Sequence, residues 1–137
     1  MARSRFSLWW AVLGAAAFLA IDALRRRASA TVSSGTQFKE GVTPAALSAE
    51  MLRALPVIEQ VHRSLGLRAP IVTSTTESHV TGLHPRGLAV DLRTRDLQPL
   101  QISALVIELR RALGTDYDVI DESRTSQPHI HVEYDPD

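Results

Sequence analysis

The chain has 137 residues, enough for one folded domain, and it contains no cysteine, which excludes disulfides and cysteine-ligated zinc sites. Basic and acidic residues balance at 15 each, but five of the basic residues and only one acid lie in the first 30 positions, so residues 31–137 carry a net charge of minus four. A mildly acidic domain lacks the basic surface that nucleic acids require, and we expect no nucleic-acid partner.

Residues 1–30 differ in composition from the rest of the chain. An apolar run at 6–24, interrupted only by Asp22, is about long enough to cross a bilayer. It predicts an N-terminal apolar helix that is a signal anchor, a cleaved secretory signal with an A-x-A site at 28–30, or a buried soluble helix. The arginines at 25–27 favour the anchor over cleavage. We therefore expect a protein that is membrane-anchored or exported to the periplasm or cell envelope and meets the membrane through this helix.

The next segments lead into the folded domain. Residues 31–41 are rich in Ser, Thr and Gly and predict a linker, which leaves 42–137 as the domain. The Thr-Pro pair at 43–44 predicts the start of a helix, and apolar residues recur at helical spacing up to Gly66. We expect Pro56 to kink or divide this helix, because proline lacks the backbone N–H and its ring clashes with the preceding turn.

The remaining elements are predicted from their apolar periods. Alternating or β-rich runs predict strands at 71–74, 88–92, 117–120 and 130–134, and a helical period ending at a glycine predicts a helix at 99–113. Two helices and about four short strands, without βαβ regularity, predict an α+β domain with a small, mostly antiparallel sheet and flanking helices.

Ionisable residues gather on one face of two of these strands. Because successive side chains point to opposite faces, Asp91 points away from the apolar side of its strand, and His129, His131 and Glu133 share one side of the last strand. If the two strands are neighbours, Asp91 meets His131, and the preceding loop brings His84 over both. Two imidazoles and one carboxylate suit zinc and leave a coordination position open, as catalytic zinc sites do.

The His84–Asp91 stretch and the His129–His131 pair are each weak evidence alone, since H-x-H often marks only an exposed strand face. Together in one small domain the two favour a metal site. The other histidines are less informative: His62 lies between apolar positions of the first helix and predicts packing, whereas His79 lies in a loop and is either solvent-exposed or a substrate contact.

The stretch His84-Pro-Arg-Gly-Leu-Ala-Val-Asp91, followed by His129-Ile-His131, resembles the zinc D-alanyl-D-alanine peptidase family. This family includes carboxypeptidases, dipeptidases and phage L-alanyl-D-glutamate endolysins and shares its site layout with the Hedgehog and lysostaphin groups. The resemblance covers about residues 70–136. The resemblance implies the family's fold, a small antiparallel sheet with flanking helices, and zinc ligands at His84, Asp91 and His131. It also implies a metallopeptidase that hydrolyses peptidoglycan stem peptides with metal-activated water, either as a carboxypeptidase or as an endolysin-type endopeptidase. We expect it to act as a monomer.

The chain departs from the family pattern around the ligands. Gly82 stands where relatives commonly have a serine, an upstream arginine is not evident in the TSTTES segment, and Pro128 replaces a common acid. The resemblance makes His129 the first candidate for the general base, because the first histidine of H-x-H lies near the catalytic water in relatives. Glu122 and Glu133 remain open as alternatives.

Substrate contacts are predicted at Arg86, Gly82 and His79, and Arg86 or Arg93 is expected to help zinc hold the developing oxyanion. For both arginines the competing interpretation is a solvated surface charge. The missing serine and arginine also favour an alternative function, in which the same fold is a non-catalytic module that binds cell wall or a partner protein.

Overall fold

The computed structural model describes residues 35–76 and 81–137. The predicted N-terminal apolar helix and His79 lie outside these residues, so their predictions stay open. Within the described ranges, no helix is long and apolar enough to span a membrane. The elements are β1 (Gln37–Phe38), the 3-10 turn η1 (Pro44–Ala46), α2 (Ala49–Ser64), β2 (Ile71–Ser74), the 3-10 turn η2 (His84–Arg86), β3 (Ala89–Arg93), α3 (Pro99–Leu113), β4 (Tyr117–Asp121) and β5 (His129–Tyr134).

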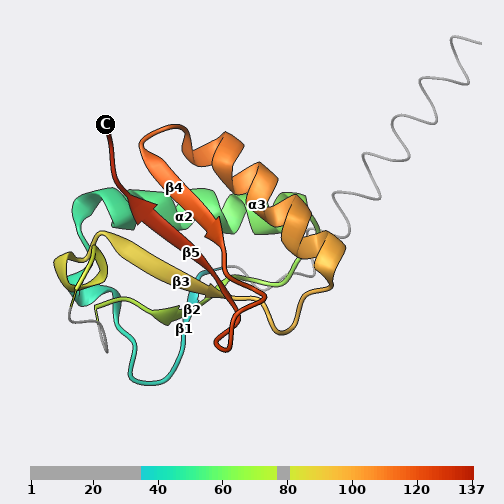
Figure 1. The fold of residues 1–137 in the computed structure, drawn as a ribbon, viewed down its shortest axis with the longest axis horizontal. Coiled ribbons are helices and arrows are strands. Elements are labelled where there is room, and N and C mark those ends of the chain that lie inside the picture. The colour runs from blue at the N-terminus through green and yellow to red at the C-terminus, as the bar shows by residue number, and fades with distance from the viewer. Residues whose placement is uncertain (1–34, 77–80) are drawn as a thin grey trace, which may run out of the picture. The chain divides into compact units, whose positions relative to one another are not determined.

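The strands form one five-stranded sheet in the order β1-β2-β3-β5-β4, shown as a ribbon in Figure 1. β1 pairs with β2 in parallel, and every other pairing is antiparallel. β3 and β5, the two strands with the candidate ligands, are therefore direct neighbours at the centre of the sheet. The predicted α+β fold with a mostly antiparallel sheet is confirmed.

Both long helices pack on one side of the sheet, and Figure 1 shows α2 passing behind β5. The core face of the sheet presents Val90 and Leu92 from β3 and Ile130 and Val132 from β5, all without solvent exposure. The helices contribute Met51, Ala54, Ile58 and Val61 from α2 and Ile102, Leu105, Val106 and Leu109 from α3. Burying an aliphatic side chain of this kind contributes roughly 1.5–3 kcal/mol, so this face supplies most of the driving force for folding.

The first helix begins later than predicted and is continuous through Pro56, so the alternative in which Pro56 divides it is wrong, whereas the predicted kink stays a prediction. Thr43 does cap a helical turn, but that turn is only η1, and α2 begins after Ser48, whose side chain accepts a hydrogen bond from the backbone N–H of Met51. Pro56 lies inside α2 and does not divide it. Proline inside a helix costs about 3 kcal/mol, and burial of the apolar stripe on either side of Pro56 offsets this cost.

The segment predicted as a linker also contributes to the sheet. Gln37 and Phe38 form β1, with hydrogen bonds from the Gln37 N–H to the Pro70 carbonyl and from the Lys39 N–H to the Val72 carbonyl, both at 2.9 Å. A two-residue strand is too short to produce an alternating pattern, so no local signal marks it.

Candidate metal centre

The candidate ligands lie on the face of the sheet that the helices leave uncovered. Asp91 of β3 is directly opposite His131 of β5 in the antiparallel register, and Arg93 is opposite His129. Because alternate residues of both strands face the core, these four side chains emerge together on the other side. The register thus brings together residues that are 40 positions apart in the chain.

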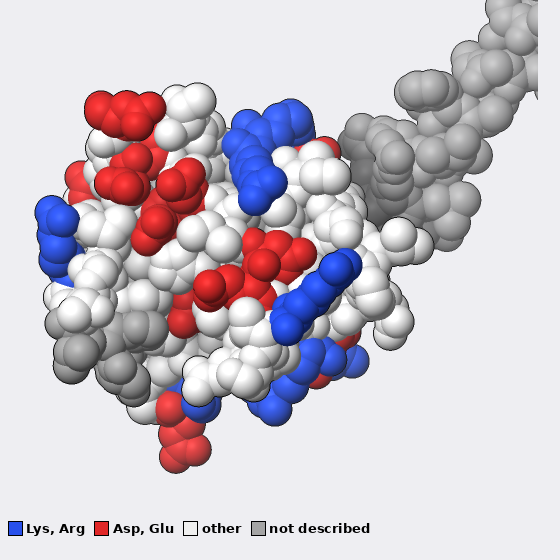
Figure 2. All heavy atoms as spheres, in the orientation of Figure 1, with Lys and Arg blue, Asp and Glu red and all other residues white. Residues whose placement is uncertain are grey.

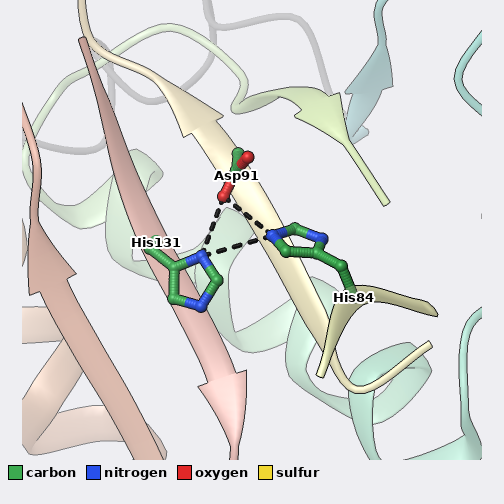
Figure 3. Close-up of side chains that lie close together, drawn as sticks. All are labelled: His84, Asp91 and His131. Atoms are coloured by element: carbon green, nitrogen blue, oxygen red, sulfur yellow. Dashed lines mark hydrogen bonds and ion pairs between the residues drawn. The ribbon is translucent and has the colours of Figure 1, made fainter. Parts of the chain in front are cut away.

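Three ligand atoms converge at this point, as Figure 3 shows. His131 Nδ1 is 2.9 Å from Asp91 Oδ1, His84 Nε2 is 3.2 Å from the same oxygen, and the two ring nitrogens are 3.3 Å apart. His84 is 4% exposed and Asp91 6%. The predicted meeting of the three side chains is therefore observed, and the group can hold a metal ion.

The loop that carries His84 depends on Gly87. This glycine ends η2 with a left-handed φ of 71°, and its N–H donates to the His84 carbonyl at 2.8 Å. A Cβ at Gly87 would lie 2.2 Å from the carbonyl oxygen of Ala46. The backbone also approaches closely at Ser48, whose N–H donates to the Gly87 carbonyl at 2.9 Å. Only glycine satisfies both the conformation and the close approach, so Gly87 fixes the position of His84 against the start of α2.

The second nitrogen of the His84 ring is held by the backbone. His84 Nδ1 donates to the carbonyl oxygen of Thr75, and the fully buried Thr75 hydroxyl in turn donates to the Thr43 carbonyl at 3.1 Å. With its proton on Nδ1, a neutral His84 presents the lone pair of Nε2 to Asp91 and His131.

The second nitrogen of His131 is held by a carboxylate. His131 Nε2 lies 2.9 Å from Glu133 Oε2, on the opposite side of the ring from Asp91. A carboxylate behind a ligating histidine orients the ring and raises its basicity, a common arrangement around protein metals. When His84 and His131 are neutral, two nitrogen lone pairs and the Asp91 carboxylate face one another. A proton or a cation must then lie among them, and a metal ion fits this donor set.

The same contacts shift two acid–base equilibria. Burial alone would lower the pKa of His131, but its hydrogen bonds to Asp91 and Glu133 outweigh burial and raise the pKa to about 9. Burial would raise the pKa of Asp91, but a hydrogen bond from His131 and the close His84 and His129 imidazoles hold this pKa well below its usual range. In the metal-free protein, therefore, a proton on His131 takes the place of a cation.

His129 lies beside the triad. Its Nε2 is 3.4 Å from Asp91 Oδ1 and 2.7 Å from Glu122 Oε2, and its Nδ1 donates to the Gln127 carbonyl at 2.6 Å. His129 Nε2 thus faces both a carboxylate and the edge of the candidate metal centre. Of the three base candidates, His129 and Glu122 form one pair here, whereas the Glu133 carboxylate is engaged behind His131.

A groove of about 780 Å³ opens beside the triad and includes Asp91 and His129 in its lining. Neither Arg86 nor Gly82 lines it: both are exposed residues of the loop around His84. Thr75, Lys39 and Arg95 were not predicted to contribute to the site or its surroundings. Arg95 had a weak signal, because it continues the alternation of Asp91 and Arg93, whereas nothing in the local sequence marks the other two.

The last histidine predicted from sequence has a packing role. His62 is 4% exposed, and its Nδ1 donates to the Arg68 carbonyl at 2.9 Å. Burial lowers the pKa of His62 and keeps the ring neutral. This agrees with the prediction that His62 packs in the first helix.

On the molecular face drawn in Figure 2, acidic and basic side chains are interspersed, and the described residues there form no continuous basic surface. Comparisons with protein families, with curated proteins and with solved structures gave no match. The assignment of chemistry to this chain therefore depends on the geometry of the site.

Proposed function

We propose that this protein is a zinc-dependent peptidase that hydrolyses amide bonds in the peptide stems of peptidoglycan, with the fold and site layout of the zinc D-alanyl-D-alanine peptidase family. The observation that carries the proposal is the convergence of His84, Asp91 and His131 on the face of the sheet opposite α2 and α3, with His129 directly beside them. Two imidazoles and one carboxylate are a ligand set of catalytic rather than structural zinc sites. The sequence motif that resembles the family contains these same residues.

The side chains around the triad have separable roles in this reaction. Zinc bound by the triad supplies a Lewis acid and acidifies water. In its neutral form His129 accepts the proton of the attacking water at Nε2, because Nδ1 is already committed to donating to the Gln127 carbonyl. Glu122, at 2.7 Å, stabilises the imidazolium that results. Glu133 is a positioning residue, which acts through His131.

The test is incubation of the full chain, zinc-loaded and metal-stripped, with purified peptidoglycan, followed by mass spectrometry of new amino termini. New termini that appear only with zinc establish the peptidase and identify the bond. His129→Gln should lower the rate by roughly 100- to 10,000-fold, the usual contribution of a general base, with zinc affinity unchanged. Arg111→Gln, on the exposed side of α3, is the matched control and should hydrolyse normally; among the described residues its ion pair is with Glu108.

The rival function is a non-catalytic module that binds cell wall or a partner protein, and Gly82 in place of a serine is the observation that favours it. Stoichiometric zinc at the triad without any new termini would support this rival and overturn the peptidase. A chelator also distinguishes the peptidase from a module with a structural zinc. A catalytic site should release zinc while the domain stays folded, whereas loss of a structural zinc should unfold the domain.

A further inference from the structure

A second cavity, of about 400 Å³, lies at the Arg93 end of β3, opposite the end that follows His84. Its walls come from the end of α2, the α2–β2 connection, β2, β3 and the start of α3. It shares only Arg93 with the groove beside the triad, and no residue of the triad lines it. The cavity is therefore separate from the candidate metal centre, and its volume falls in the range of small-molecule sites.

Two residues in the wall of this cavity carry buried nitrogen atoms without a hydrogen-bond partner. Among the described residues three buried side-chain polar atoms have no partner, and two of them, His62 Nε2 and Arg93 Nε, belong to residues that line the cavity. Buried polar atoms are nearly always paired in folded proteins, because an unpaired one has given up its bonds to water for nothing. Two such nitrogens in one cavity wall indicate a surface that fits a polar ligand.

His62 contributes an acceptor. Its Nδ1 donates to the Arg68 carbonyl at 2.9 Å, and burial lowers the pKa of His62, so the ring is neutral with its proton on Nδ1. Nε2 therefore carries a lone pair and requires a donor from the ligand.

Arg93 contributes a donor. Its Nη1 forms an ion pair with Asp96 Oδ2 at 3.5 Å, whereas the Nε–H has no acceptor within the part of the chain that the structure describes. The Asp96 carboxylate also lines the cavity and offsets the charge of the guanidinium. Arg93 Nε therefore requires an acceptor from the ligand but not a full negative charge.

A neutral group that donates from one atom and accepts at another satisfies both nitrogens, and a carboxamide is such a group. A carboxylate would set its lone pairs against that of His62 Nε2, and an amidinium would have no lone pair for Arg93. A hydroxyl would have to reach both nitrogens with one atom. The exposed Arg68 at the cavity makes an anion the competing ligand, and the buried side chains of Leu67 and Ala69 favour an aliphatic group beside the polar one.

We propose that this cavity binds a small aliphatic carboxamide, whose N–H donates to His62 Nε2 and whose carbonyl accepts from the Nε–H of Arg93. The amide is either primary, as at an amidated chain end, or secondary, as in a peptide bond, since both offer one donor and one acceptor. The inference goes beyond the proposed peptidase function and depends neither on zinc nor on hydrolysis.

The test uses probes of matched shape that differ in the polar group. Isovaleramide, N-methylisovaleramide, isovalerate and isovaleramidine present a primary amide, a secondary amide, an anion and a cation on the same aliphatic chain. Each is titrated into the full chain with isotope-labelled histidine, and the shift of the His62 ring signals in NMR spectra gives the dissociation constant. The titrations are made with both zinc-loaded and metal-stripped protein.

Two variants remove the two nitrogens separately. His62→Asn keeps a donor near the position of Nδ1, for the Arg68 carbonyl, and deletes Nε2. Arg93→Met keeps the length of the side chain and deletes the Nε–H. Arg111→Gln is the control. Because His62→Asn has no ring to observe, the backbone amide signals of Leu67 and Ala69 report binding in all three variants.

We expect one of the two amides to bind at least about threefold to tenfold more tightly than isovalerate and isovaleramidine, which is the usual contribution of one neutral hydrogen bond, and the tighter amide identifies the source. His62→Asn and Arg93→Met should each weaken its binding by a similar factor of about 3 to 10, and Arg111→Gln should leave it unchanged. If His62→Asn does not fold, Arg93→Met carries the test.

Three results would overturn the inference: no shift with either amide, isovalerate binding as tightly as the amides, or amide binding that persists in every folded variant at His62 and Arg93. These results are distinguishable from failure of the proposed function. Amide binding that is equal in zinc-loaded and metal-stripped protein supports the cavity as an independent site, whether or not the protein hydrolyses peptidoglycan.

Discussion

The two faces of the β3–β5 strand pair differ in chemistry, one being apolar and the other ionisable. On one face Val90, Leu92, Ile130 and Val132 pack against both helices. On the other face the same strands carry Asp91, His129, His131 and Glu133, which contact one another across the strand pair. Adjacent residues of one strand thus belong to a hydrophobic core and to a cluster of ionisable groups.

This difference shows how a domain of about one hundred residues can carry a buried ionisable cluster. Because side chains alternate along a strand, residues that stabilise the fold and residues that form the site occupy successive positions. The core face supplies the burial free energy, and it holds the backbone on which the polar face is built. Substitutions on the two faces should therefore have separable effects.

The sharpest test of the comparison uses the neighbours Asp91 and Leu92. Asp91→Ala should lower zinc affinity below detection while the domain stays folded. The loss should exceed the roughly 10- to 100-fold that is typical when a residue behind a ligand is replaced. Leu92→Ala, at a fully buried position, should lower the free energy of unfolding by about 2–5 kcal/mol and leave the zinc affinity of the folded protein intact. Chelator-buffered zinc titration and urea unfolding of the zinc-free proteins measure the two quantities. If both variants lost both properties equally, the faces would not be separable.

Glu133 tests whether the polar face is organised beyond the ligands. Glu133→Gln keeps the size of the side chain but weakens its interaction with the second ring nitrogen of His131, so zinc affinity should fall about 10- to 100-fold. The rate at saturating zinc should stay close to that of the unsubstituted protein. A large loss of rate with normal zinc affinity would instead make Glu133 the general base.

The pH dependence follows from two groups on the polar face. In the metal-free protein the pKa of His131 is raised from 6.5 to about 9, so its contribution to stability is complete below pH 6.5 and is lost as the pH rises toward 9. The pKa of Asp91 is lowered from 3.8, so its contribution is present above that pH and is lost in acid. Urea unfolding of metal-free protein between pH 3 and 10 should show both losses, and a flat profile would contradict the protonated His131.

Zinc must displace the proton from His131, so the same equilibrium affects metal binding. Zinc affinity should rise by about tenfold per pH unit below the raised pKa of His131, about 9, because one proton leaves for each ion bound. Chelator competition at fixed free zinc measures this slope. A slope near zero would mean that His131 is neutral before zinc binds.

A separate effect is expected where the polar face meets the loop at η2. Gly87→Ala should lower the free energy of unfolding by more than the roughly 1–2 kcal/mol that a left-handed conformation costs, because the new Cβ also meets the Ala46 carbonyl. Gly82→Ala is the matched control: its φ of 82° is similar, but among the described residues no atom beyond its chain neighbours lies within 4 Å of a new Cβ. Equal losses in thermal unfolding of the two variants would remove the close approach as the reason for glycine at 87.

Local patterns predicted several elements closely. The helix at 99–113 has the predicted bounds, β3 is shifted by one residue at both ends, and β5 begins one residue earlier than predicted. Pro56 does not divide the first helix, because burial of the surrounding apolar stripe outweighs its local propensity. β1 was missed because its two residues carry no period.

The sequence by itself determined which side chains share a face, because alternation along a strand is a property of the backbone and needs no partner. It therefore placed Asp91 away from the core and His129, His131 and Glu133 together. Only the tertiary structure decided the register that sets Asp91 against His131, the Thr75 carbonyl that orients His84, and the approach of Lys39 to the groove. These contacts join segments whose proximity results from packing of the whole domain, and no local pattern encodes that proximity.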